Sequence, residues 1–197
     1  HALDENFKPG IGFASRVGIK NYIWFLTISP RPNIPHIKKL VFKPFDINYT
    51  TDMDGVLETR YEEIRPLGII FNSGDTVDFK IWNKYDFVDK PGGWRIFGNT
   101  IVPRGVYKWW YYDISYSGSR NRAVALDLNT NFGEHYSGAR NYYNASLSFK
   151  RTKYYSLSAD MNYNDITIEK SRFITREYGG RVGVDINTRL FSMVMSL

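Results

Sequence analysis

The second half of the sequence alternates apolar and polar residues at every second position, over segments of ten residues or more. This period is produced by β-strands that have one apolar face. It is clearest from 121 to 133, where small and polar residues alternate with Val124, Leu126, Leu128 and Phe132. No other period in the sequence, helical or not, is as regular. We therefore predict an all-β chain.

The same alternation predicts strands on both sides of this segment. In the second half they cover 105–118, 141–151, 154–164 and the residues from 178 to the end. In the first half the pattern is less regular and covers Tyr22 to Ile28, Val41 to Tyr49, Leu67 to Phe71 and Val77 to Ile81. Pro44 and Pro66 predict bulges or strand ends, because proline donates no hydrogen bond to a sheet. The total is about ten strands in a single domain, 1–197.

The connections between these segments favour an antiparallel up-and-down order. Short connections are expected at 29–35, 72–75, 117–121, 151–153 and 188–190. Longer connections are expected at 51–55, 86–104, 133–140 and 165–171. Every second connection then belongs to the same class, as in a membrane barrel with short periplasmic turns and long outer loops.

Alternation alone does not decide which face of a barrel is inside. A soluble lipocalin-like barrel turns its apolar face inward, whereas a membrane barrel turns it to lipid. The predicted strands match the roughly 9 to 11 residues that a tilted membrane strand needs and exceed the five or six common in soluble proteins. Tyrosine and tryptophan gather near the strand ends, as in the interfacial girdles of membrane barrels. Lys108 falls on the apolar face, but near a strand end, from which its ammonium can reach the interface.

Composition excludes several other classes of protein. The longest apolar runs, such as Tyr22 to Leu26, are far shorter than the roughly 20 residues of a membrane-spanning helix. The chain has no cysteine, which excludes disulfides and zinc–thiolate sites. Its net charge is +6, but the lysines and arginines are dispersed near turns rather than gathered in one patch, so we expect no nucleic-acid partner.

Charged and amide side chains on the predicted lumen face are the candidate functional residues. They could line a permeation path or select a solute by charge, or else form ion pairs that fill a narrow interior. This set consists of Asp113, Asp127, Asn129, Asp160, Asn162, Glu177, Arg181 and Asp185. Tyr107, Trp109 and Tyr111 share a face and could stack on a sugar ring, with packing inside the barrel as the alternative.

A second set of residues raises the possibility of an enzyme. Glu134, His135 and Ser137 carry the groups of a hydrolase acting on lipid or glycan. A catalytic triad, however, is built by geometry between distant elements, and neighbours on one loop form it with difficulty. A plain polar loop is the alternative. No metal-ligand spacing and no cofactor motif is found in the sequence, so neither a metal nor a cofactor is expected.

Five local strings in the chain stand out, namely GFASRVG (12–18), ISPRPN (28–33), DGVLETR (54–60), FNSGD (71–75) and IVPRGVY (101–107). In this order they resemble the outer-membrane β-barrel domain of unknown function found at the C-terminus of large bacterial envelope proteins. Members of that family carry a carbohydrate-binding domain similar to family 9 ahead of the barrel. The resemblance implies that this chain lacks that domain and the last strands of the barrel.

Together these observations predict a segment of an antiparallel transmembrane β-barrel in the bacterial outer membrane. We expect it to act as a pore or as an envelope anchor in contact with outer-membrane lipid. The resemblance adds glycans as candidate partners, through the domain that precedes the barrel. A soluble ligand-binding barrel and a barrel enzyme are the alternatives.

Overall fold

The computed structural model describes residues 2–3, 17–97, 100–150, 154–169, 171–184 and 193–196. Within these residues all regular secondary structure is β-strand, which confirms the predicted all-β class. A helix long and apolar enough to cross a membrane is not found among them.

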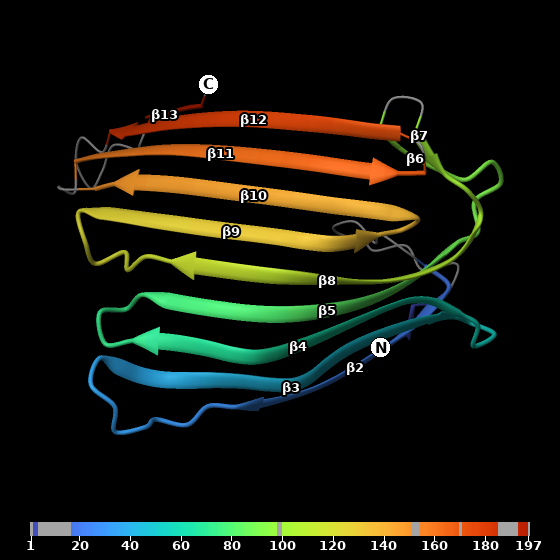
Figure 1. Cartoon of the computed structure of the whole chain (residues 1–197), viewed down its shortest axis with the longest axis horizontal. Coiled ribbons are helices and arrows are strands. Elements are labelled where there is room, and N and C mark those ends of the chain that lie inside the picture. Colours follow the sequence, from blue (N-terminus) through green and yellow to red (C-terminus); the bar gives the residue numbers. More distant parts are fainter. Residues whose placement is uncertain are drawn as a thin grey trace.

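Eleven strands form one antiparallel sheet, and most of them pair with their neighbours in the sequence (Figure 1). In spatial order they are β1 (Ala2–Leu3), β2 (Ile19–Ile28), β3 (Ile37–Asp52), β4 (Leu57–Phe71), β5 (Thr76–Val88), β8 (Gly105–Ser117), β9 (Val124–His135), β10 (Gly138–Phe149), β11 (Tyr155–Ile168), β12 (Ser171–Val184) and β13 (Met193–Ser196). The up-and-down order is as predicted. Between β5 and β8, the strands β6 (Trp94–Phe97) and β7 (Thr100–Val102) form a separate hairpin.

The sheet is open in the described residues. No pairing joins its two edges, which are formed by β1 and β2 at one end and by β12 and β13 at the other. The predicted strands are present in the described residues, although residues 185–192 of the last predicted segment lie outside them. Both proline positions behave as expected. Pro44 lies in β3 and Pro66 in β4, each beside a register shift in the β3–β4 or β4–β5 pairing. A bulge at each site lets the strand continue past a residue that has no N–H group.

The predicted alternation of short and long connections is wrong. Strands β9 and β10 are joined by Tyr136 and Ser137 alone, and β11 and β12 by residues 169–170, where longer loops were expected. Tyr136 has a positive φ of 51°, a value that two-residue hairpin turns require. The prediction of long loops failed because the strand ends at this rim carry polar residues such as Arg140 and Asn141, a composition that is typical of loops. Connection length therefore does not distinguish the two rims.

The pattern of burial in this sheet is the reverse of that in a water-soluble β-sandwich, where apolar side chains are buried and polar ones are exposed. We call the face that bears Asp113 and Asn129 the polar face, and the face that bears Leu128 and Leu147 the apolar face. Leu128 is 43% exposed and Leu147 is 49% exposed, whereas Asp113 is 8% exposed. The apolar side chains thus stand outward and the polar ones crowd together inside.

The β6–β7 hairpin packs on the polar face at one rim of the sheet. Val102 of β7 and Ile168 of β11 are both 0% exposed, and Val88 of β5 and Ile166 of β11 complete the cluster. Strands β8, β9 and β10 lie between β5 and β11. The hairpin therefore bridges distant strands and covers one end of the polar face, at the right-hand ends of β11 and β12 in Figure 1. We call this end the hairpin rim.

Candidate functional site

The polar face brings together the residues proposed from the sequence to line a lumen. Register places Asp113 opposite Asn131, Asn129 opposite Asn144, and Asn144 opposite Asn162. Asp127, Asp160, Glu177 and Arg181 follow on the same face at even spacing along their strands. Asp185 lies outside the described residues. The seven described candidates therefore share one surface across β8 to β12.

A chain of ion pairs begins on this face at β3 and β4. The ammonium of Lys43 lies 2.6 Å from the carboxylate of Asp46 and 3.3 Å from that of Glu63. Arg65 contacts Glu63 at 3.2 Å and Asp78 of β5 at 3.1 Å. Each cation therefore touches two carboxylates, which offsets the cost of removing these charges from water. The sequence analysis missed this part of the network, because bulges disturb the alternation in β3 and β4.

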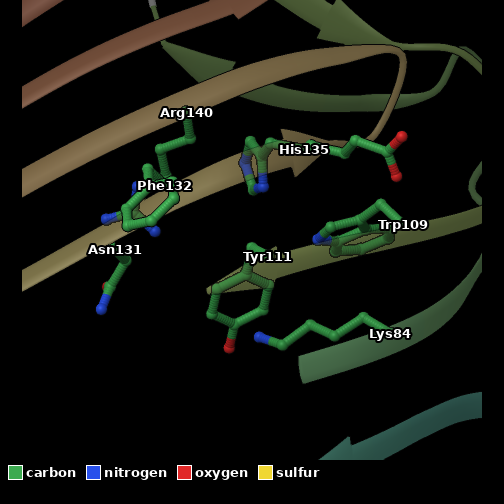
Figure 2. Close-up of a pocket in the computed structure, with 8 residues that line it drawn as sticks. Lys84, Trp109, Tyr111, Asn131, Phe132, His135 and Arg140 are labelled. Atoms are coloured by element: carbon green, nitrogen blue, oxygen red, sulfur yellow. The ribbon is translucent and has the colours of Figure 1, made fainter. Parts of the chain in front are cut away.

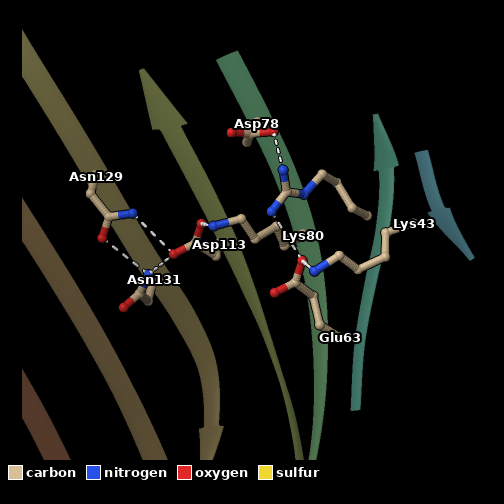
Figure 3. A network of polar contacts seen from close by, with 8 residues as sticks. Lys43, Glu63, Asp78, Lys80, Asp113, Asn129 and Asn131 are labelled. Carbon is tan, nitrogen blue, oxygen red and sulfur yellow. Dashed lines mark hydrogen bonds and ion pairs between the residues drawn. The ribbon is translucent and has the colours of Figure 1, made fainter. Parts of the chain in front are cut away.

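The network continues on β5, β8 and β9 (Figure 3). Lys80 lies 3.5 Å from one carboxylate oxygen of Asp113. The other oxygen accepts hydrogen bonds from the side-chain amides of Asn129, at 3.0 Å, and Asn131. Two amide donors and one cation therefore hold Asp113 in place. In the centre of the polar face, each cation of this network lies beside at least one carboxylate.

Further candidates take part in smaller contacts. The Asp127 carboxylate accepts a hydrogen bond from the Ser117 hydroxyl at 2.5 Å and pairs with Arg120. The Asn162 side-chain oxygen accepts from the Asn144 amide at 2.7 Å and from the Tyr142 hydroxyl. These contacts link neighbouring strands, so much of the predicted lumen set also stabilises the sheet.

The three aromatic candidates lie on the polar face, and each packs against an aromatic ring of a neighbouring strand or turn. Trp109 is 4% exposed, and the Tyr136 ring lies 4.6 Å from it. Tyr107 packs edge to face on Tyr136 and donates its hydroxyl to the Pro103 carbonyl. Tyr111 stacks on Trp82 at 5.9 Å. Tyr136 therefore covers the ring of Trp109, and stacking on a sugar ring stays a prediction for these residues.

These rings fill a wedge that opens between β8 and β9. Their pairing ends at Tyr111 and Gly133, although each strand keeps its other neighbour up to the rim. Gly133 has a φ of +141°, and a Cβ there would lie 2.7 Å from the Tyr111 Cα. Glycine thus permits the close backbone approach from which the two strands diverge. Beyond it, the Glu134 carboxylate accepts a hydrogen bond from the unpaired Trp110 N–H at 3.0 Å.

A small cavity of about 70 Å³ lies in this wedge (Figure 2). Its walls carry two cations, Lys84 of β5 and Arg140 of β10, together with the ring of Tyr111 and the amide of Asn131. The Lys84 ammonium lies 5.2 Å from the centre of the Tyr111 ring and 4.9 Å from that of Tyr61. Sequence analysis missed both cations because β5 and β10 are not neighbours in the sheet: β8 and β9 lie between them.

The structure does not assemble the hydrolase suggested by Glu134, His135 and Ser137. Glu134 is engaged by the Trp110 amide, and the His135 ring packs edge to face on Trp109 at 5.8 Å. Adjacent positions of a strand point to opposite faces, which separates Glu134 from His135. Among the described residues, no group of three or more acidic or histidine side chains is arranged to bind a metal.

A face with this chemistry can hold water and polar solutes against a wall of paired charges, and it offers two further cations at the hairpin rim.

Comparisons of the chain with family models, with curated proteins and with solved structures find no match. The family resemblance noted in the sequence therefore gains no support from them.

Proposed function

We propose that this chain forms wall strands of a bacterial outer-membrane β-barrel whose polar face lines a path for small polar solutes. The observation that carries the proposal is the reversed burial of the sheet. Large apolar side chains stand exposed on one face, while carboxylates, amides and cations are packed on the other. In water such a face would be a large exposed apolar patch, but in a bilayer it is the surface that contacts lipid.

Contacts between exposed side chains support a continuous lipid-facing surface. Leu126 lies opposite Leu147, and Phe149 lies opposite Leu157, on neighbouring strands. A groove on this face is lined mainly by apolar groups, including Leu128 and Met161, and has the shape and chemistry to accept an acyl chain. Strands β8 to β12 contain 12 to 14 residues each, enough to cross the hydrocarbon core when tilted.

A lipocalin-like barrel fits this structure less well. Such a barrel closes around its apolar face, whereas the β6–β7 hairpin packs on the opposite, polar face of this sheet. The anchor role and the pore role both require the membrane location. We favour the pore, because the polar face presents charged groups along eight successive strands of the sheet, from β3 to β12.

The membrane location is tested by placing a charge on each face of β9. Leu128→Arg puts a cation near the middle of the apolar face, and we expect it to lower the unfolding free energy in lipid vesicles by about 2 to 4 kcal/mol. Asn129→Arg is the matched control on the polar face. Its side chain can still donate to Asp113, so we expect a much smaller change. Urea unfolding followed by tryptophan fluorescence measures both.

Two results would contradict the proposal at different levels. Equal effects of the two arginine variants, or a monodisperse protein without detergent, would reject the membrane location. Ion conductance of the reconstituted full chain in planar bilayers tests the pore. A silent barrel that inserts normally would reject the solute path and leave the anchor.

A further inference from the structure

The two cations at the hairpin rim differ from the cations of the central ion-pair network. Lys43, Arg65 and Lys80 each lie within 4 Å of a carboxylate. Lys84 and Arg140 have no such ion pair within the described part of the chain. Burying a charge without a partner is unfavourable, so two unpaired cations in one half-buried cavity favour the binding of an anion.

The acidic groups near the cavity are engaged elsewhere. Asp86 follows Lys84 on the same face of β5, but its carboxylate accepts the Tyr136 hydroxyl at 2.7 Å. Glu134 borders the cavity and accepts the Trp110 amide. Neither carboxylate forms an ion pair with Lys84 or Arg140 among the residues described.

The donors of both cations remain free for a ligand. Arg140 uses its Nε to donate to the Asn164 side-chain oxygen at 2.8 Å, which orients the guanidinium. The terminal nitrogens of Arg140 have no hydrogen-bond partner in the described residues. The Lys84 ammonium also has none there, and it lies over the rings of Tyr61 and Tyr111. The guanidinium is a planar fork that fits an oxyanion, while the ammonium adds a point charge.

We propose that the cavity between Lys84 and Arg140 binds the carboxylate or phosphate group of a small anionic solute. The cavity volume of about 70 Å³ admits an oxyanion group rather than a whole sugar ring, so the rest of the solute would extend along the polar face. The proposal deepens the proposed function, because it gives a class of solute to the same face. It rests on the local geometry of β5, β8, β9 and β10.

The test is titration calorimetry on the full chain refolded in detergent, with inorganic phosphate and glucuronate as probes. Neutral glucose serves as the uncharged comparison. We expect both anions to bind with one site per chain and glucose to show no binding. Phosphate alone would assign the site to phosphate groups, and glucuronate alone would assign it to acidic sugars; either result supports an oxyanion site.

Four variants make the test specific. Lys84→Gln and Arg140→Gln should each weaken anion binding at least tenfold, the loss expected for one charge-assisted hydrogen bond. Arg120→Gln removes the same charge at the opposite rim, where Arg120 pairs with Asp127, and should leave binding unchanged. Lys84→Arg retains the charge and should retain binding. The β-sheet circular dichroism of each variant shows whether it has folded.

Three outcomes would overturn the site. They are the absence of anion binding to the folded native chain, equal binding by native chain and both glutamine variants, and glucose binding as strong as that of the anions. These outcomes are separable from failure of the proposed pore. A barrel that binds phosphate but conducts no ions rejects the solute path and keeps the site, whereas a conducting barrel without anion binding does the opposite.

Discussion

Replacing Ile168 by alanine should release the β6–β7 hairpin from the sheet. Ile168 is 0% exposed and belongs to the cluster through which β7 contacts β11. The substitution removes three carbons, each worth about 0.8 kcal/mol when buried. With the cavity that remains, the loss is about 3 kcal/mol, within the usual range for such substitutions. Because the hairpin covers this side chain, the loss falls mainly on the docked state.

A loss of about 3 kcal/mol raises the population of the undocked hairpin roughly 100-fold. Amide hydrogen exchange in β6 and β7 should therefore accelerate by up to that factor, while the central amides of β10 keep their native rates. Mass spectrometry of the peptide that covers 91–104 measures the effect in detergent. Ile174→Ala is the matched control, because Ile174 is exposed on the apolar face of β12.

The reasoning would be refuted by unchanged exchange of the hairpin in Ile168→Ala. Equal acceleration in Ile174→Ala would also refute it, since a general loss of sheet stability would then explain both variants.

Two further predictions concern the backbone and the turns. Gly133→Ala should lower the free energy of unfolding in detergent by about 1 to 3 kcal/mol, because its φ is strained for alanine and its Cβ would meet β8; Gly180→Ala, with open space around it, should change the urea midpoint little. The Ser73 hydroxyl and the Ser119 amide, followed by Arg122, lower the pKa of Asp75 to about 2. Its contribution to stability is therefore present above the unfolded pKa of about 3.9 and is lost as the pH falls through the folded pKa. Asp75→Asn should unfold more easily than the native chain at pH 7, and the difference should shrink to a small remainder at pH 2, where the folded carboxyl is half ionised. A constant difference across this range would contradict the role of the carboxylate.

Much of the fold follows from local patterns in the sequence. Alternation around Leu126 and Leu128 predicted β9, and Pro44 and Pro66 predicted bulges. The sequence alone carries these signals because the side chains of a strand point alternately to its two faces, and this alternation does not depend on which strand lies beside it. The shared face of Asp113 and the other candidates follows from the same geometry.

The contacts of the site required the tertiary structure. The pairing of Lys80 with Asp113 depends on strand register, which the large excursion between β5 and β8 hides from the sequence. The tight turn at residues 136–137 and the short connection between β11 and β12 were missed because polar strand ends resemble loops. The covered ring of Trp109 likewise depends on Tyr136, which reaches it only when β9 and β10 fold back.

The sequence by itself determined that this chain forms long antiparallel strands with one apolar and one polar face, because that property is local and periodic. Only the tertiary structure decided which face is buried, how the hairpin crosses it and which cations lack a carboxylate. Lys84 and Arg140 lie 56 positions apart in the sequence and belong to strands separated by β8 and β9. Their approach depends on the curvature of the sheet and on the wedge at Gly133, which no local pattern encodes.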